Sequence, residues 1–274
     1  MKGVLKFSDG VREACPKAGF DEVEKEYERA REQLVPTLKR SDLSRIPMHF
    51  SHPFKARVLF QAALRRCMDL SEATCAELNA ERLIPSFLLS RGCLETACVV
   101  DDMRLRIFAL LDAPTDEKLE TLGRDLLKAT FGARADRWKA VLSDGTESGK
   151  DELSALNVVT IVERVARKRD EPFILELYED LSEHAHPNCA GMVGAFADLS
   201  QETHEQMFPD PWQDPERRGL LVGPVNAVGL SLFLIVSGMN ALENRIIEFV
   251  RVTEESLHRS GTWPDHIPYR WKTG

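Results

Sequence analysis

Polar side chains interrupt an otherwise apolar segment at residues 84–111. This segment contains Arg91, Glu95 and Asp102 among mostly hydrophobic neighbours. At about 100° per residue, these three side chains and Cys98 fall on one side of a helix. Arg91 and Glu95 are four residues apart, so an ion pair between them is within reach. Because an unpaired buried charge costs several kcal/mol, we expect these charges to be paired if this face points inward.

A second group of polar side chains lies in LYEDLSEHAHPN, residues 177–188. Tyr178, Ser182 and His186 follow one another at intervals of four residues and are therefore expected to share one helical face. Pro187 ends that helix, and the free carbonyl groups of a helix end favour a cationic imidazole. His186 thus occupies a position suited to acid–base chemistry near neutral pH.

The chemistry open to these residue types is proton transfer and the stabilisation of a developing negative charge. A histidine, a hydroxyl group, an arginine and a carboxylate can together support general acid–base catalysis and hold an oxyanion or a phosphorane. The same groups can form a satisfied network that keeps two buried helices in register. The sequence does not decide whether the chain is an enzyme. The candidate catalytic residues are Arg91, Glu95, Tyr178, Ser182 and His186.

The elements that must position these residues are helices. Apolar residues recur at intervals of three and four, and no long segment alternates between apolar and polar residues. Helices are expected over residues 20–34, 54–80, 84–111, 116–131, 136–142, 152–169, 172–184, 189–197 and 225–259. Three prolines between residues 208 and 218 exclude a continuous helix or a central strand there. We therefore expect an all-α, multi-helix bundle with a long buried C-terminal helix.

This pattern divides the chain into three parts. Residues 1–52 are expected to form an N-terminal helical arm, residues 53–260 the bundle core, and residues 261–274 an irregular aromatic tail. The narrow apolar seam of residues 20–34 is expected to pack against the body, with a dimer contact as the alternative. The tail aromatics are expected to dock on the body, with a partner site as the alternative.

The composition of the chain limits which classes of function it can have. A net charge of −8 argues against bulk electrostatic binding of nucleic acid, although a local basic pocket stays open. The six cysteines contain no C-x-x-C pair, so buried thiols are expected rather than disulfides or a zinc site. The N-terminal residues lack the apolar stretch of a secretory signal, which favours the cytoplasm. Neither a Gly-rich phosphate loop nor a dinucleotide fingerprint is present, so no cofactor is predicted.

One segment challenges the cytoplasmic assignment. Residues 219–242 carry no charge and are long enough to span a bilayer. Pro224, Asn226 and Ser231 dilute the apolar run, and no cluster of Lys or Arg follows it. A fully buried central helix has the same composition. We therefore expect a buried helix and no membrane partner.

The two polar stretches carry a family resemblance. RGCLE at residues 91–95 and LYEDLSEHAHPN at residues 177–188 resemble a diffuse group of uncharacterised prokaryotic all-α proteins. The shared features are R-x-x-x-E on one core helix and Y-x-x-L-S-x-x-x-H-P at the end of another. This group is similar to the HEPN-like helical proteins, many of which occur in toxin–antitoxin and anti-phage defence systems. The likeness extends over residues 53–259, and it implies that the five candidate residues form the site.

The chain also departs from the pattern of this family at one point. Active HEPN ribonucleases usually place a histidine four to six residues after an arginine on one helix. Here Arg45–His52 and Arg259–His266 have a comparable spacing, but prolines lie in or beside both segments. The departure argues against ribonuclease activity.

Three functions follow from these observations. The first is a HEPN-like protein of a prokaryotic stress or defence system that binds or cuts RNA through Arg91 and His186 and forms a homodimer. The second is a non-catalytic scaffold or regulatory subunit that binds a protein partner. The third is a metal-binding bundle, because Glu183–His186 and Glu255–His258 both read E-x-x-H.

Overall fold

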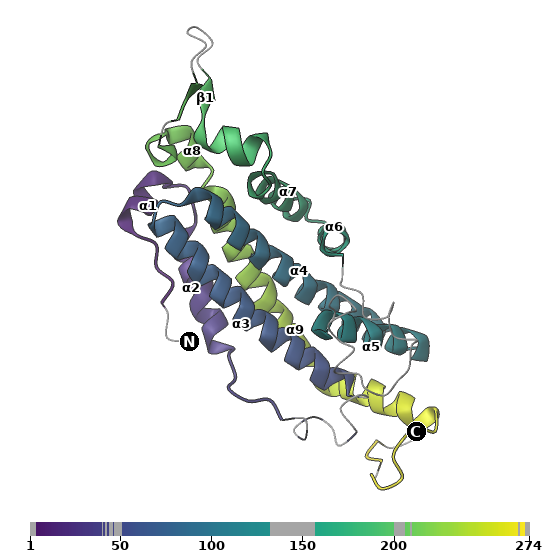
Figure 1. The fold of residues 1–274 in the computed structure, drawn as a ribbon. Coiled ribbons are helices and arrows are strands. Elements are labelled where there is room, and N and C mark those ends of the chain that lie inside the picture. Colours follow the sequence, from purple (N-terminus) through teal and green to yellow (C-terminus); the bar gives the residue numbers. More distant parts are fainter. Residues whose placement is uncertain are drawn as a thin grey trace, which may run out of the picture. The chain divides into compact units, whose positions relative to one another are not determined.

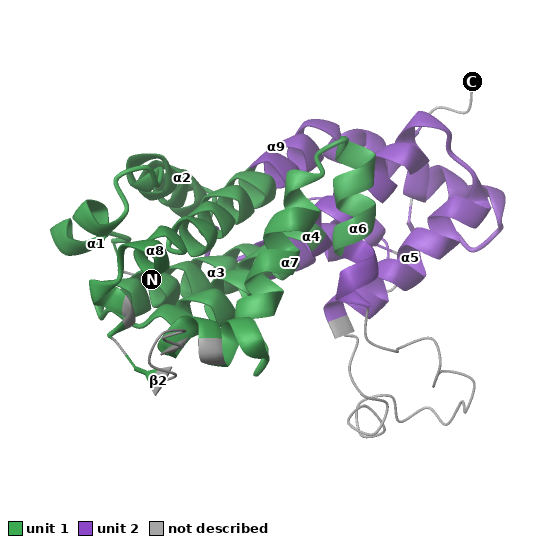
Figure 2. Cartoon of the chain, turned by 90° about the horizontal axis from the view of Figure 1, so that it is seen from above, with its two compact units in different colours: residues 1–34, 63–98, 162–236 green, residues 35–62, 99–161, 237–274 purple. Residues whose placement is uncertain are grey.

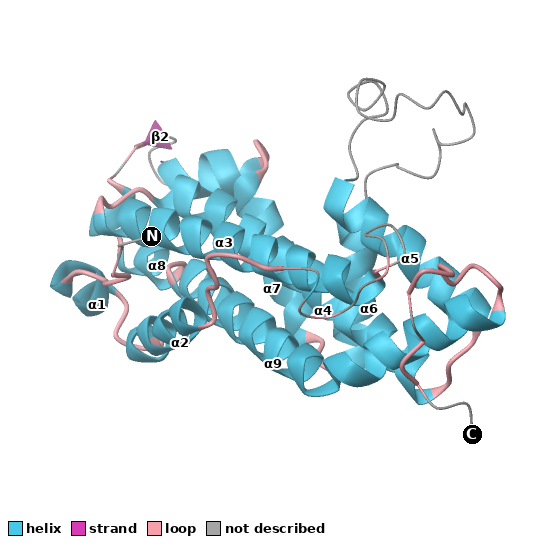
Figure 3. Cartoon of the chain, turned by 90° about the horizontal axis from the view of Figure 1, so that it is seen from below, coloured by secondary structure: helices cyan, strands magenta, loops and turns pink. Residues whose placement is uncertain are grey.

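The computed structural model describes residues 4–39, 41, 43, 46, 51–131, 157–199, 206–208, 210–267 and 269–271. Helices make up most of this part of the chain (Figures 1 and 3). The α-helices are α1 Asp9–Ala14, α2 Phe20–Glu32, α3 His52–Asn79, α4 Leu83–Asp112, α5 Asp116–Phe131, α6 Val158–Arg169, α7 Phe173–Ala185, α8 Pro215–Gly219 and α9 Val222–Arg259. The shorter elements are the π-helix η5 Cys189–Gly194, the 3-10 helix η6 Pro211–Gln213, and the strands β1 Asp198–Leu199 and β2 Gln206–Met207. The predicted all-α bundle is confirmed.

The observed helices begin and end within a few residues of the predicted limits in most cases. Of the helix expected over 152–169, the described part contains α6 from Val158, and Asn157 just before it is not helical. The helix expected over 136–142 and the residues 152–156 lie outside the described part of the chain. In the short helical segment expected over 189–197, residues 189–194 form a π-helix.

Two short strands form the only sheet within the described residues. β1 and β2 are antiparallel, with Asp198 opposite Met207 and Leu199 opposite Gln206. The proline-rich segment that follows contains only the short helices η6 and α8, as its prolines require. Aspartate side chains cap both, because Asp210 accepts from the Trp212 amide at 3.0 Å and Asp214 from the Glu216 amide at 2.8 Å.

The chain divides into two compact units (Figure 2). Unit 1 contains residues 1–34, 63–98 and 162–236, and unit 2 contains residues 35–62, 99–161 and 237–274. Helices α3, α4, α6 and α9 each contribute residues to both units. The division into an arm, a core and a tail therefore stays a prediction from the sequence.

In unit 1, α2 lies along α3 and α9 (Figure 1). The seam residues Phe20, Val23, Tyr27 and Ala30 are all buried. The Tyr27 hydroxyl donates a hydrogen bond to Glu72 of α3, and burial raises the pKa of that phenol well above its usual value. The seam therefore packs against the body, as expected.

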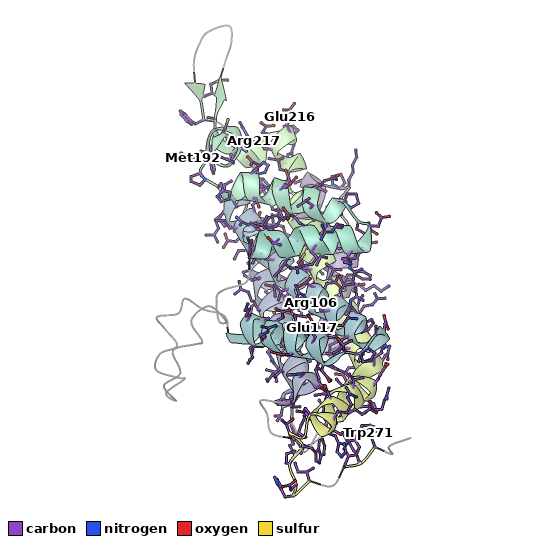
Figure 4. All side chains as sticks on the ribbon, turned by 90° about the vertical axis from the view of Figure 1, so that its right-hand side faces the viewer. Arg106, Glu117, Met192, Glu216, Arg217 and Trp271 are labelled. Carbon is purple, nitrogen blue, oxygen red and sulfur yellow. The ribbon has the colours of Figure 1, made fainter. Side chains whose placement is uncertain are left out.

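In unit 2, the residues after α9 return to the end of that helix. Arg270 donates two hydrogen bonds of 2.9 Å to the buried Glu254, and the Trp271 indole donates a third of 2.7 Å. The Tyr269 ring stacks on His258 with 4.1 Å between ring centroids. Figure 4 shows Trp271 in this C-terminal segment. The expected docking of the tail aromatics is confirmed for Tyr269 and Trp271.

Two segments, Leu83–Asp112 and Pro215–Arg259, are long and apolar enough to cross a membrane by length and composition. The core helix of a soluble protein passes the same test. Val225, Leu232 and Phe249 of α9 are fully buried among other residues of the chain. The long buried C-terminal helix is therefore present as predicted.

The cysteines are free thiols, and five of the six are buried. Cys67 and Cys93 adjoin each other in unit 1, where a hydrogen bond between them, together with burial, raises the pKa of Cys67 well above its usual value. Cys189, the first residue of η5, is exposed. Five thiols thus behave as the small apolar side chains that the sequence predicts.

Candidate functional site

Arg91 and Glu95 lie one turn apart on α4. The Arg91 Nε atom donates a hydrogen bond of 3.0 Å to Glu95 Oε1. Their side chains are 24% and 27% exposed, so both remain partly accessible to water. The ion pair expected from the i, i+4 spacing therefore forms.

Tyr178 of α7 completes this polar group. The Arg91 Nη2 atom donates to the Tyr178 hydroxyl at 3.2 Å, and that hydroxyl donates to Glu95 Oε1 at 3.3 Å. The Arg91 guanidinium carbon also lies 5.3 Å from the centre of the Tyr178 ring, within range of a cation–π contact. We call Arg91, Glu95 and Tyr178 the polar triangle. It joins α7 to α4 within unit 1.

The electrostatics of the triangle keep Arg91 charged. Burial by itself would lower the pKa of Arg91, but the contacts with Tyr178 and Glu95 raise that pKa above its usual value. Arg91 is therefore a fixed cation and not a proton donor. In any reaction it would act by stabilising negative charge.

Ser182 is bonded within its own helix. Its hydroxyl donates a hydrogen bond of 2.7 Å to the backbone oxygen of Tyr178, four residues earlier. This is the usual back-bonding of a helical serine. Among the described residues no base contacts the Ser182 hydroxyl to activate it as a nucleophile.

His186 is not brought into the polar triangle. It is the exposed C-cap residue of α7, with extended backbone angles (φ −86°, ψ 150°), and its amide donates to the Ser182 oxygen at 3.1 Å. Its ring makes no hydrogen bond to any described residue. The physical reason is Pro187, which disfavours helical angles at the residue before it. The shared helical face expected from the sequence therefore ends at Ser182.

His184 is the histidine that contacts α4, and sequence reasoning missed it. Its ring stacks on Phe87 of α4 with 4.4 Å between centroids, and only 12% of its side chain is exposed. Its Nδ1 lies 2.9 Å from the backbone oxygen of Asp180 and 3.6 Å from a carboxylate oxygen of the same residue. Leu177 and Leu181 are buried and precede His184 by seven and three residues, and this helical spacing is the signal that could have placed His184 on the packed face of α7.

The remaining polar residues singled out in the sequence have other partners. Asp102 accepts a hydrogen bond of 2.8 Å from Arg106 within unit 2, so the predicted charge pairing holds for it too. In the second E-x-x-H motif, Glu255 pairs with Arg251 at 3.0 Å. Within the described residues no three His, Cys, Asp or Glu side chains are grouped as metal ligands would be.

The fold and these contacts define an all-α helical protein. No protein-family model, curated protein or solved structure matches the chain. The HEPN-like resemblance therefore rests on the two sequence motifs alone.

Proposed function

We propose that this chain is a non-catalytic helical protein that binds a protein partner. The supporting observation is that the polar groups of the triangle form their hydrogen bonds with one another. Arg91 and Tyr178 direct their hydrogen bonds at groups within the triangle, and Ser182 directs its hydroxyl at its own helix. Such a closed network fixes the register of two helices and leaves little for a substrate.

A surface suited to a partner lies around η5 and the β-hairpin. Four large apolar side chains there are exposed, with Phe208 reaching 75%. Met207 pairs with Asp198, two residues after Phe196, so β2 lies beside the segment that follows η5. Exposed groups of this kind mark sites of interaction more often than do single apolar residues. We call this surface the hairpin patch; its members are Met192, Phe196, Met207 and Phe208.

Hydrogen bonds from a buried arginine fix the backbone next to the hairpin patch. The guanidinium of Arg217 is buried and donates to the backbone oxygens of Gly194 at 3.1 Å and Ala197 at 3.2 Å. Figure 4 shows Arg217 and Met192 at the same end of unit 1. These bonds hold the segment between η5 and β1, which reduces the ordering cost of binding.

Charge near the patch indicates the chemistry of the partner. Asp210 and Glu216 are exposed, and Glu216 lies at the same end of unit 1 as Met192 (Figure 4). The chain as a whole carries a net charge of −8. The partner proposed here therefore presents apolar side chains flanked by Lys or Arg.

The test compares the hairpin patch with an equally apolar surface elsewhere. Phe208→Ser removes the most exposed patch residue, and Ile247→Ser on α9, which is 63% exposed, is the matched control. Affinity purification with quantitative proteomics would identify proteins retained by wild type and by Ile247→Ser. We expect one partner to bind Phe208→Ser about tenfold or more weakly when both proteins are purified. Equal binding by the two variants would contradict the proposal.

RNA cleavage by a HEPN-like protein of a cytoplasmic stress or defence system is the second candidate function. One observation favours it, because α7 places His184 against the helix that carries Arg91. The test is cleavage of single-stranded RNA by the purified chain. Loss of activity in both His184→Ala and Arg91→Ala would support this candidate. RNA decay that is the same for wild type and both variants would contradict it.

A further inference from the structure

A groove of about 370 Å³ opens on unit 1, lined by residues of α2, α7 and α9. Its formation depends on glycines, because neither Gly19 nor Gly229 adds a side chain to it. A Cβ atom at Gly229 would lie 2.9 Å from Val23 Cγ2, so the two helices approach closely there. The groove is separate in sequence from the hairpin patch and shares no residue with it.

Most of the groove surface is apolar. Phe173, the first residue of α7, and Phe233 of α9 are 46% and 47% exposed. Leu230 lines the groove beside them, and the buried Val23 adds further apolar surface. Two half-exposed phenylalanines on one groove offer aromatic surface to an apolar ligand. The volume lies near the lower end of the range for small-molecule sites, about 300–1,000 Å³.

Three polar side chains also line the groove. Glu22 and Glu26 of α2 supply carboxylates, and Asn226 of α9 supplies an amide. Glu26 pairs with Arg29, whereas Glu22 makes no ion pair with any described residue. The Asn226 amide is half-buried and likewise makes no side-chain hydrogen bond to the described residues. None of the described lining residues is basic.

We propose that this groove binds a small amphiphilic cation, an aromatic or alkyl primary amine. The apolar body of the ligand contacts Phe173, Leu230 and Phe233. Its ammonium group pairs with the exposed carboxylate of Glu22, and Glu26, which also contacts Arg29, adds negative charge to the same side of the groove. The negative charge of the carboxylates beside this apolar surface also disfavours anionic ligands of the same shape.

The test uses three ligands of similar shape and different charge. Binding of 2-phenylethylamine, 2-phenylethanol and 3-phenylpropionate to the full chain is followed by ligand-observed NMR titration. We expect the amine to bind about fivefold or more tightly than the acid, with the alcohol between them. Glu22→Gln is expected to weaken amine binding about two- to fivefold and to leave alcohol binding unchanged. Phe233→Ala is expected to weaken binding of all three ligands.

Glu28→Gln is the matched control. Glu28 lies on the same helix, is exposed, pairs with Arg31 and does not line the groove. Circular dichroism confirms that each variant keeps its helical content. Equal binding of amine and acid, or equal effects of Glu22→Gln and Glu28→Gln, would overturn the proposal. So would an absence of saturable amine binding at about 10 mM. Light scattering that shows a dimer broken by Phe233→Ala would assign the groove to a second copy instead.

Discussion

At the scale of single residues, the polar triangle shows both the reach and the limit of sequence reasoning. The spacing of Arg91 and Glu95 predicted their ion pair because helical geometry alone brings them together. The contact with Tyr178 depends on how α7 packs on α4, which spacing within one helix cannot reveal. His186 was selected by its spacing from Tyr178, yet Pro187 removes it from the helix.

The hydroxyl of Tyr178 should contribute measurably to stability. Tyr178→Phe keeps the ring but leaves Arg91 and Glu95 each without one hydrogen-bonding partner. We expect a loss of about 1–2 kcal/mol in the free energy of unfolding, measured in urea. Ser182→Ala is the control, because its hydroxyl bonds only to its own helix, and should change stability by less than about 0.5 kcal/mol. An equal loss of unfolding free energy in the two variants would show that the triangle adds nothing to stability.

His52 should make stability depend on pH. Burial, with a smaller effect of Lys55, lowers the pKa of His52 to about 4, and its Nδ1 has no hydrogen-bond partner among the described residues. Between that pKa and the ordinary value of about 6.5, the unfolded chain binds more protons than the folded chain. The free energy of unfolding should therefore fall as the pH decreases from about 6.5 to about 4, by up to about 3 kcal/mol.

Urea titrations of wild type and His52→Gln across this pH window would measure the effect. The variant should lose most of the dependence on pH, since glutamine does not titrate. A pH dependence of the same size in both proteins would assign it to other groups.

At the scale of elements, the helices were well predicted because most have one apolar face or are apolar throughout. The seam of α2 is an example, since Val23, Tyr27 and Ala30 recur at helical spacing and are buried. The sequence placed the ends of α3 and α4 at their junction to within one residue, but it did not predict the conformation of that junction. There Glu81 adopts a left-handed conformation (φ 60°), and the Arg82 amide bonds to the Glu77 oxygen at 2.8 Å. This is a helix-ending motif that usually uses glycine, so the sequence offered no signal for it.

The close approach of α2 and α9 should make Gly229 sensitive to substitution. In Gly229→Ala the new methyl group would meet Val23 at 2.9 Å. We expect a destabilisation of about 1–3 kcal/mol from overpacking, measured by urea unfolding. Gly219→Ala is the control, because a Cβ atom there meets nothing within 4 Å. It should be neutral or slightly stabilising. A stable Gly229→Ala variant would mean that the two helices can separate without cost.

At the scale of the whole molecule, composition predicted the class of fold but not the surfaces proposed here as binding sites. An all-α chain of 274 residues with a net charge of −8 fits many functions. The hairpin patch could not be anticipated, because the pairing of β1 with β2 brings Met207 and Phe208 beside the segment that follows η5. The groove on unit 1 likewise joins residues from three helices that are distant in sequence.

The charge of the molecule should affect how fast the partner binds. If the partner carries basic residues, the association rate should fall as salt increases, while the dissociation rate changes little. Stopped-flow association at about 50 mM and about 500 mM salt would measure this. An association rate that is independent of salt would contradict a basic partner.

The most direct measurement is equilibrium binding of the purified partner to Tyr178→Phe under conditions where this variant remains folded. If the polar triangle is structural and the hairpin patch binds the partner, the Kd should stay within about twofold of the wild-type value, while Phe208→Ser loses about tenfold or more. A folded Tyr178→Phe variant that loses binding, while Phe208→Ser keeps it, would place the functional site at the triangle and contradict the proposed function.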